Sequence, residues 1–329
     1  DPKIWKKDDQ FYMVCVLKQK NNRGAMVMFQ STDAKIWTYK GILDSSKDGL
    51  SNMWECPDVS VIDGKDVLIF SPQEVQENDE LGFHNGNNSI YVTGTLDYEN
   101  CKFIRETRPE NGYTAALVDY GIDFYAPETA KLKDGRTIMI GWMQAWESYI
   151  TPKNYIWSGM MTLPRELSFK NNRLYQQPVR ELEKWKADKR EGIISTGTDL
   201  AEIVSKVERH FEIDLNLNDA KGTVKLILGD AEEKVILEVN TDEAFISFDR
   251  TQTSNPGAIP FRKAKLRIQN ELKNLKIICD TCSLEVFIND GIMTFTNIFF
   301  FEKSFSNFNV KNDTSQNITY DFWKIIPNS

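Results

Sequence analysis

Histidine is almost absent from this chain, which has only His84 and His210 among 329 residues. A histidine metal centre needs several imidazoles, and a Ser-His-Asp triad needs one placed beside its serine. Two isolated histidines argue against both kinds of site. If the protein is an enzyme, we expect carboxylates to carry its chemistry.

Cysteine is also scarce, and the five residues present are odd in number and scattered: Cys15, Cys56, Cys101, Cys279 and Cys282. This usage is typical of reduced thiols in a cytoplasmic protein rather than of a secreted disulfide framework. Cys279 and Cys282 form a CxxC, but it lies in the strand-like run IICDTCSLEVFI. We interpret them as strand positions beside a turn; the alternatives are a zinc or a redox site.

The chain lacks both a long apolar run and a long basic run. No segment approaches the roughly 20 apolar residues of a membrane span, and 40 basic against 48 acidic residues give a formal net charge of −8. The lack of such an apolar run argues against a membrane span. Because phosphate binding needs a positive surface, the negative net charge disfavours a nucleic-acid partner. The 41% of hydrophobic residues instead predicts a globular protein with room for two domains.

Short β-strand patterns, by contrast, are abundant. Apolar runs such as DVLIFS (66–71) and TIMIGWM (137–143) end at turn residues. Three longer stretches resemble one another: DPKIWKKDDQFYMVCV (1–16), ECPDVSVIDGKDVLIFS (55–71) and YAPETAKLKDGRTIMIGW (125–142). Each opens near a proline, runs through a strand, turns, and returns in an apolar strand, as internal repeats do.

This repeat predicts that each copy opens a blade of a β-propeller. The innermost strands of a propeller line a central channel, so equivalent positions of successive blades converge there. Asp1 and Glu55 both stand just before the proline of their repeat. We therefore expect two carboxylates near one axis; the alternative is an ordinary β-sandwich whose hairpins look alike.

The pattern changes after residue 172. Residues 173–195 mix charges with spaced apolar residues, which predicts a linker with a short amphipathic helix between a propeller domain at 1–172 and a second domain at 196–329. Alternating strands fill that second domain, and the NDG at 289–291 indicates a tight hairpin turn. We expect a β-sandwich with a structural role.

Several motifs then point to a family. MWECPDVSVIDGKDVLIFSPQ (53–73) contains a WECPD block, and Asp1-Pro2 matches the end of an RDP motif. DYGIDFYAPETAKLKDGRTIMIGWM (119–143) fits D-x-G-x-D-x-Y-A, and WSGMMTLPRELSF (157–169) fits W-x-G-x-x-x-x-P-R-E-L. In this order the blocks resemble glycoside hydrolase family 32, the family of invertases and sucrose-6-phosphate hydrolases, over essentially the whole chain.

The resemblance implies an all-β fold: a five-bladed β-propeller, its first blade largely missing from this chain, followed by a C-terminal β-sandwich. It also implies hydrolysis of β-fructofuranosides with retention, with Glu55 as general acid/base and Asp1 as the residue that stabilises the transition state. Retaining hydrolysis uses two carboxyl groups about 5–5.5 Å apart. The proton donor must keep its proton near neutral pH, which burial or a neighbouring negative charge favours.

Five further residues are candidate substrate contacts by this resemblance: Trp54, Asp119, Asp123, Tyr125 and Trp142. The tryptophans could stack on sugar faces or belong to the core, and the two aspartates could bind hydroxyls or cap a turn. Tyr125 is expected near the acid.

Three other positions are less specific. Glu128 stands where many relatives carry glutamine, so it can add a negative charge to the channel. Arg165 and Glu166 are expected to pair with each other or with backbone.

One part of the family pattern has no counterpart here. The nucleophile belongs to a W-M-N-D-P-N-G block upstream of RDP, and none of these 329 residues forms such a block. We therefore expect the nucleophile upstream of Asp1 and expect the 329 residues alone to be inactive.

The substrate expected from the resemblance is sucrose 6-phosphate or sucrose. The alternatives are an exo-fructanase acting on inulin or levan, and a non-catalytic sugar-binding fragment. The chemistry needs no metal and no organic cofactor, and the sequence gives no indication of oligomeric state.

Overall fold

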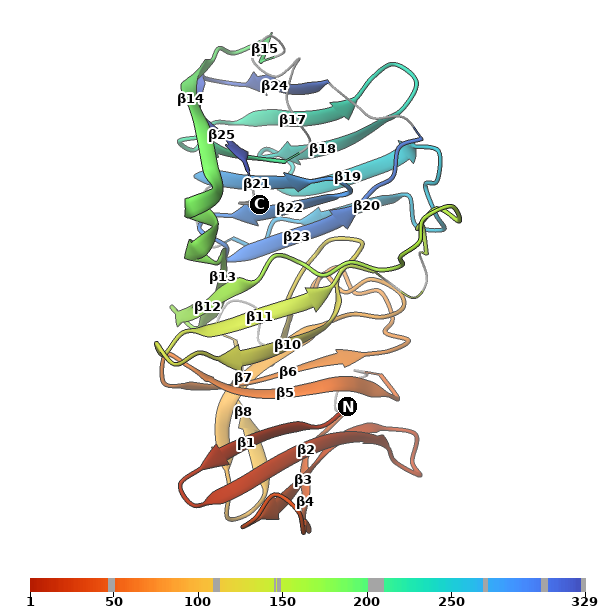
Figure 1. The fold of residues 1–329 in the computed structure, drawn as a ribbon, viewed down its shortest axis with the longest axis vertical. Coiled ribbons are helices and arrows are strands. Elements are labelled where there is room, and N and C mark those ends of the chain that lie inside the picture. Colours follow the sequence, from red (N-terminus) through yellow and green to blue (C-terminus); the bar gives the residue numbers. More distant parts are fainter. Residues whose placement is uncertain are drawn as a thin grey trace. The chain divides into compact units, whose positions relative to one another are not determined.

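The computed structural model describes residues 1–46, 51–108, 113–144, 146, 149–200, 210–268, 272–302 and 307–326. In this part of the chain the secondary structure is β-strand apart from one 3-10 helix, η1 (Arg180–Trp185). The chain divides into two compact units (Figure 1). The first contains Asp1–Val118, Phe124–Trp142 and Leu167–Leu174, and the second contains Asp119–Asp123, Met143–Glu166 and Tyr175–Ser329.

The strands before η1 form three antiparallel sheets, and all of their residues belong to the first unit except 165–166 and 175–178, which belong to the second. One contains β1 (Lys3–Lys7), β2 (Gln10–Lys18), β3 (Gly24–Ser31) and β4 (Thr38–Ser45). The next contains β5 (Trp54–Ile62), β6 (Lys65–Pro72), β7 (Ile90–Asp97) and β8 (Lys102–Arg105), with β9 (Ala115–Leu117) beside β7. The last contains β10 (Tyr125–Lys131), β11 (Thr137–Trp142), β12 (Arg165–Lys170) and β13 (Arg173–Pro178). These strands include every strand expected from the three sequence repeats.

The opening strands of the three repeats are β1, β5 and β10, and β5 contacts both of the others. The opening strand of the second repeat therefore lies next to the opening strands of both other repeats. Apolar residues from the β5 and β10 sheets form one core cluster: Ile62, Val67, Ile69, Tyr91, Ala116, Val118, Phe124, Met139, Leu167 and Leu174. Burial of such side chains supplies most of the stability of a β-fold.

The second unit contains two six-stranded sheets. One has the order β14 (Lys186–Ile194), β25 (Ile318–Ile325), β16 (Phe211–Asn216), β21 (Asn274–Asp280), β22 (Ser283–Ile288) and β23 (Met293–Ile298). The other has the order β15 (Thr198–Asp199), β24 (Phe308–Thr314), β17 (Gly222–Gly229), β18 (Lys234–Asn240), β19 (Phe245–Gln252) and β20 (Phe261–Lys265). The ring of Phe308 lies 4.6 Å from that of Phe211 on the opposite sheet, so the sheets form a sandwich.

The predicted hairpin turn at 289–291 is confirmed. It joins β22 to β23, and Asn289 and Asp290 adopt φ values of 45° and 60°. Gly291 continues this left-handed backbone with a φ of 82°, and residues 289–292 form a four-residue connection between the paired Ile288 and Met293.

The predicted linker at 173–195 differs from what the structure contains. Residues 173–178 are β13, residues 180–185 are η1, and β14 is paired along its length with β25 in the second unit. The units also do not follow one another along the chain, because 119–123 and 143–166 belong to the second. A sequence pattern shows strands, but not which sheet a connecting segment joins.

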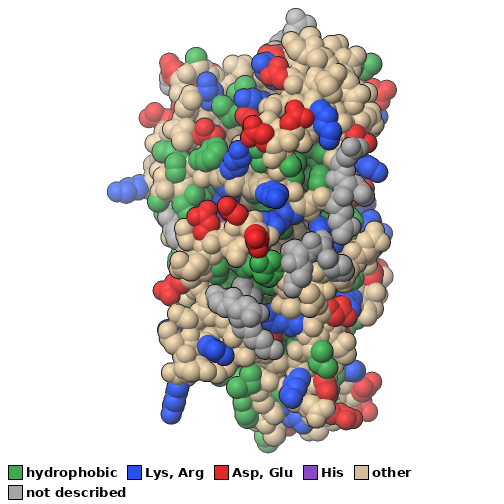
Figure 2. Space-filling view, turned by 180° about the vertical axis from the view of Figure 1, so that it is seen from behind, with side chains coloured by type: hydrophobic (Ala, Val, Ile, Leu, Met, Phe, Trp, Pro, Cys, Tyr) green, Lys and Arg blue, Asp and Glu red, His purple; other side chains and the backbone are tan. Residues whose placement is uncertain are grey.

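The surface carries mixed charge. Figure 2 shows lysine and arginine side chains interspersed with aspartate and glutamate on the face it presents. No helix among the described residues is long and apolar enough to cross a membrane.

Candidate active site

Glu55 lies on β5 at a β-bulge. Glu55 pairs with Ser71 of β6 and Asp58 pairs with Ile69. Two residues of β5 between these pairs therefore stand opposite one residue of β6, so β5 carries one extra residue. Cys56 takes up the irregularity with a φ of 47°, and Pro57, which has no N–H to donate, is tolerated at such a site. Because a bulge shifts the alternation of side chains, Glu55 and Asp58 are brought toward the same face of the strand.

The same bulge recurs on β10. Tyr125 pairs with Trp142 of β11, Glu128 pairs with Ile140, and Ala126 has a φ of 51°. Position by position, Tyr125 is therefore the counterpart of Glu55, and Glu128 is the counterpart of Asp58. The repeat seen in the sequence is a repeat of backbone geometry.

Tyr125 and Glu55 meet across the two strands. The Tyr125 hydroxyl donates a hydrogen bond to Glu55 Oε2 at 2.8 Å and lies 3.3 Å from the carbonyl oxygen of Ser71. Tyr125 is only 2% exposed, and burial, then its bond to Glu55, raises the pKa of its phenol. The phenol therefore keeps its proton and fixes one oxygen of the Glu55 carboxylate. The expectation that Tyr125 lies near Glu55 is confirmed; the acid role of Glu55 and the contact of Tyr125 with substrate stay predictions.

Asp1 lies beside Cys56, the neighbour of Glu55. Asp1 is exposed, and its Oδ2 is 4.0 Å from Cys56 Sγ. Burial, followed by the negative charges of Glu128 and Glu55, raises the pKa of Cys56 to about 11, so the thiol is a donor. In the repeat, Asp1 corresponds to Cys56 rather than to Glu55, because each directly precedes its proline. Two carboxylates nevertheless flank one thiol, which is compatible with the predicted convergence.

The two tryptophans have different surroundings. Trp54 has no exposed surface, and its ring lies 4.1 Å from that of Phe70. The prediction that Trp54 stacks on a sugar is therefore wrong, since its ring is used in the core. Trp142 is partly exposed and stands opposite Tyr125 on β11, so a sugar contact there stays a prediction.

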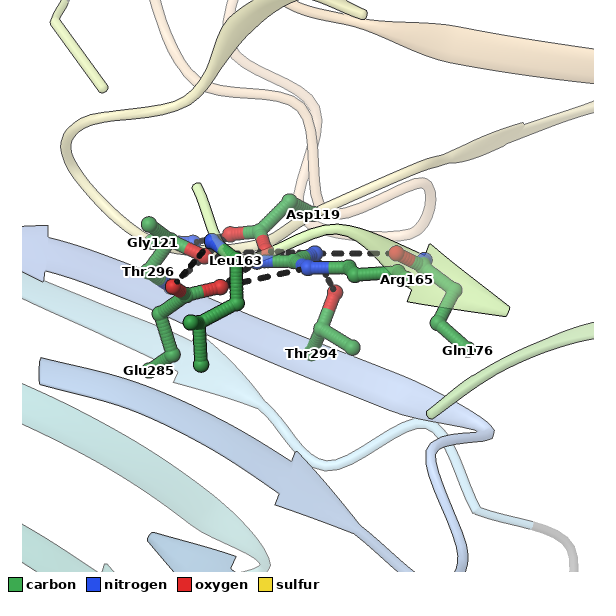
Figure 3. A network of polar contacts seen from close by, with 8 residues as sticks. All are labelled: Asp119, Gly121, Leu163, Arg165, Gln176, Glu285, Thr294 and Thr296. Atoms are coloured by element: carbon green, nitrogen blue, oxygen red, sulfur yellow. Dashed lines mark hydrogen bonds and ion pairs between the residues drawn. The ribbon is translucent and has the colours of Figure 1, made fainter. Parts of the chain in front are cut away.

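Asp119 is in the second unit, and its side chain is fully buried. Arg165 donates to its Oδ2 at 3.0 Å, and the backbone N–H groups of Gly121 and Thr296 donate to its Oδ1 at 2.9 Å each (Figure 3). The hydroxyl of Thr296 also donates to Oδ2, at 2.6 Å. The predicted sugar contact is not supported for Asp119, because its acceptors are occupied; the alternative of a turn-capping aspartate fits the bond to Gly121.

Asp123 is also fully buried in the second unit, where Arg250 donates to its Oδ2 at 2.7 Å and the Ile298 N–H at 2.9 Å. The predicted sugar contact is unsupported here as well. Burial raises the pKa of Asp123, and Arg250 opposes that effect. Each of the two aspartates of the D-x-G-x-D motif is thus paired with a buried arginine.

The arginine partners show what sequence reasoning missed. Arg165 does not pair with Glu166: it binds Asp119 and Glu285, while Glu166 pairs with Arg180 at 2.6 Å. The expected pairing with backbone is confirmed for Glu166, whose Oε1 accepts a hydrogen bond from the Arg180 backbone N–H at 2.9 Å, whereas the ion pairs of both residues are with other side chains. Arg250 was not expected at all, although it continues the buried period-two series of Ile246 and Phe248 on β19, which is a usable signal.

None of the five cysteines is joined in a disulfide. Cys279 pairs with Leu284 and Asp280 with Ser283, so Cys279 is a strand residue of β21 and Cys282 lies in the turn between β21 and β22. Among the described residues, no group of three or more His, Cys, Asp or Glu side chains is placed to hold a metal ion.

Glu128 supplies a pH-dependent charge close to Cys56. Its Oε2 lies 3.3 Å from Lys3 Nζ. Burial raises the pKa of Glu128 from its ordinary 4.5 to about 7, the charge of Asp58 adds to the effect, and Lys3 opposes it. Because 46% of the side chain is exposed, solvent limits the energetic consequence.

We expect Glu128→Gln to flatten the pH dependence of stability. Between pH 4.5 and about 7 the folded state binds this proton more tightly than the unfolded state does, so stability falls as the pH rises through that window. Urea denaturation at the two ends of the window should show a smaller loss for Glu128→Gln than for the wild type. An equal loss in both proteins would contradict the assignment.

The fold and the site together define a class: sheets of propeller type that carry a hydrogen-bonded glutamate near a second carboxylate, joined to a β-sandwich. Sequence profiles identify the family. The profile of the Glycosyl hydrolases family 32 N-terminal domain matches residues 1–178, and that of the Glycosyl hydrolases family 32 C terminal matches residues 174–324. The chain therefore belongs to glycosyl hydrolase family 32.

Individual relatives agree. The chain is 33% identical over 304 residues to a sucrose-6-phosphate hydrolase of Vibrio alginolyticus, covering 92% of this chain and 59% of the relative. It is 31% identical over 301 residues to one of Escherichia coli, covering 88% and 59%. The chain thus spans about three fifths of the length of these relatives.

Solved structures also match. The Bombyx mori GH32 beta-fructofuranosidase BmSUC1 superposes with a TM-score of 0.82 at 25% identity, covering 100% of this chain and 66% of that one. The sucrose-6-phosphate hydrolase from Lactobacillus gasseri has the same fold, with a TM-score of 0.81 at 24% identity, covering 99% and 65%. The predicted all-β fold, propeller followed by sandwich, is confirmed.

Proposed function

We propose that the protein containing this chain hydrolyses β-D-fructofuranosides, with sucrose 6-phosphate or sucrose as the substrate. The observation that carries the proposal is the 2.8 Å hydrogen bond from Tyr125 to Glu55, which orients a carboxyl group at the β5 bulge, next in sequence to Cys56, whose thiol faces Asp1. The relatives named sucrose-6-phosphate hydrolase support the substrate class.

The proposed reaction is a double displacement with retention. Glu55 donates its proton to the glycosidic oxygen while a carboxylate nucleophile attacks the anomeric carbon of the fructosyl group, and the bond to the leaving sugar breaks. Glu55 then removes a proton from water, which attacks the fructosyl-enzyme and releases fructose. Asp1 binds fructosyl hydroxyls and stabilises the transition state. We propose that the nucleophile comes from an Asn-Asp-Pro block outside these 329 residues.

Three substrates test the proposal in the full-length protein: sucrose, sucrose 6-phosphate and inulin. We expect fructose release to be faster from one of the two sucrose forms than from inulin. Faster release from inulin would favour the exo-fructanase, and no release from any of the three would overturn the proposed hydrolysis.

A non-catalytic sugar-binding role is the alternative that the same protein can be tested for. The coding region upstream of the Asp1 codon separates the two. An in-frame Asn-Asp-Pro-Asn segment supports the hydrolase, whereas a start codon directly before Asp1 supports the binding role.

Replacing Tyr125 by phenylalanine should lower kcat for sucrose while changing KM little. The variant loses a hydrogen bond to a charged group, worth about 1.5–3 kcal/mol, which corresponds to roughly 10- to 150-fold in rate. Steady-state kinetics of the full-length variant measure the effect. Phenylalanine at Tyr12, a tyrosine of β2 in the same unit, is the matched control; equal kcat values in the two variants would count against the role of Tyr125.

A further inference from the structure

The residues that follow the three repeat prolines meet in one charged cluster. These residues are Lys3, Asp58 and Glu128, after Pro2, Pro57 and Pro127. Lys3 Nζ lies 2.9 Å from Asp58 Oδ2 and 3.3 Å from Glu128 Oε2. One cation from β1 therefore joins carboxylates from β5 and β10.

Asp58 is the buried centre of this cluster. Its side chain has no exposed surface, whereas that of Lys3 is 18% exposed. Besides Lys3, Asp58 accepts hydrogen bonds from the hydroxyl of Thr129 at 2.9 Å, from the Thr129 backbone N–H, and from Ser60 at 3.3 Å. Lys3 also donates to the carbonyl of Thr129. A buried carboxylate needs such partners, and their geometry then fixes the strands that carry them.

The cluster is close in sequence to the proposed catalytic groups. Lys3 is two residues after Asp1, and Asp58 is three residues after Glu55 across the bulge. Between Glu55 and Asp58 the chain passes through Cys56, whose thiol faces Asp1. The position of Asp1 relative to Cys56 therefore depends on how β1 packs against β5. The Lys3–Asp58 ion pair links these two strands directly.

We propose that the Lys3–Asp58 ion pair positions Asp1 beside the Cys56–Glu55 bulge for the reaction proposed above, on which this inference rests. Lys3 and Asp58 are positioning residues, because they act through Asp1 and Glu55 rather than on the sugar. Transition-state binding is sensitive to small displacements, and an error of about 1 Å can cost about 10²-fold in rate.

The test compares variants of the full-length protein. Lys3→Met alone would leave Asp58 buried without its cation and could unfold the protein, so the informative variant is the double substitution Lys3→Met/Asp58→Asn. Lys3→Arg keeps the charge. Lys65→Met is the matched control, because Lys65 pairs with Glu106 in the same unit without joining β1 to β5.

We expect the double variant to lose about 10- to 100-fold in kcat per folded molecule, on sucrose and on 4-nitrophenyl β-D-fructofuranoside alike, since misplacing Asp1 affects both leaving groups. Lys3→Arg should retain most of the activity, and Lys65→Met should match the wild type. Folded protein is counted by circular dichroism in each sample, so a loss of folding alone does not imitate the result.

A second readout does not depend on hydrolysis. Alkylation of Cys56 by iodoacetamide, followed by peptide mass spectrometry, should be several-fold faster in the double variant, while the buried Cys101, Cys279 and Cys282 serve as internal references. A wild-type protein inactive on every fructoside would overturn the proposed function. Faster Cys56 alkylation in the double variant would still support the positioning of Asp1 by the Lys3–Asp58 ion pair. Wild-type kcat together with wild-type Cys56 alkylation in the double variant would overturn the inference.

Discussion

Glu55→Gln in the full-length protein is expected to lower kcat for sucrose by about 10²- to 10⁴-fold, the range that general acid–base catalysis supplies. The amide cannot protonate the glycosidic oxygen, and the sugar alkoxide is a poor leaving group without that proton. Glutamine keeps the shape of the side chain and an oxygen that can accept the bond from Tyr125. The substitution therefore removes the proton and leaves the geometry of the bulge in place.

A substrate with a good leaving group separates this role from others. Loss of 4-nitrophenolate from 4-nitrophenyl β-D-fructofuranoside needs little acid assistance, so Glu55→Gln should lower fructosylation with this substrate far less than with sucrose. Single-turnover kinetics isolate that step from the later hydrolysis. Glu106→Gln, which removes the charge of a glutamate in a partly buried ion pair of the same unit, is the control. Equal losses on both substrates would contradict the acid role of Glu55.

The position of this site was predictable from sequence to a useful extent. Prolines at 57 and 127 mark the same bulge geometry, and Pro2 stands at the corresponding place before β1; this repeat brings Tyr125 to Glu55 and Lys3 to Asp58. The pairing of residues 55 and 70 positions apart follows from the repeat, not from local propensity. The prediction overlooked an offset that the sequence shows: Asp1 directly precedes Pro2, as Cys56 precedes Pro57, whereas Glu55 stands two residues before Pro57.

The failures concern buried polar residues and the assignment of segments to units. Asp119 and Asp123 resemble binding residues in a motif, because nothing local shows that their partners are Arg165 and Arg250, 46 and 127 residues away. Trp54 is a similar case: a tryptophan beside Glu55, the proposed catalytic acid, suits sugar stacking and core packing equally until its burial is known. The strand patterns of the sequence predicted which segments form sheets. Residues 119–123, however, belong to the second unit through backbone hydrogen bonds to β23, which no sequence pattern indicates.

Those backbone bonds depend on the buried network around Arg165. Tyr120 N–H donates to the Thr294 carbonyl at 2.9 Å and Asp123 N–H to the Thr296 carbonyl at 3.1 Å, which aligns 119–123 with β23. A Cβ on Gly121 would lie 1.9 Å from the Thr296 carbonyl oxygen, so only glycine permits this approach. Arg165 neutralises the segment's Asp119 at 3.0 Å and Glu285 of β22 at 2.7 Å (Figure 3).

Arg165→Met is therefore expected to lower the free energy of unfolding by about 3–5 kcal/mol, because breaking a buried ion pair leaves its partners charged and uncompensated. Two carboxylates, Asp119 and Glu285, lose their cation together, and both are almost fully buried. A loss of this size is a large part of the stability of an ordinary domain. Urea denaturation of the full-length variant, followed by circular dichroism, measures the change.

The neighbouring ion pair provides the control. Arg180 pairs with Glu166 at 2.6 Å, but 68% of the Arg180 side chain is exposed, and an exposed pair contributes at most about 1 kcal/mol. Arg180→Met should therefore change the free energy of unfolding little, although it also removes one arginine from one ion pair in the same unit. Equal destabilisation by the two substitutions would show that burial does not determine how much Arg165 contributes to the free energy of unfolding. A stable Arg165→Met protein would mean that Asp119 and Glu285 are neutral in the folded state, since two charged carboxylates cannot remain buried there without a cation.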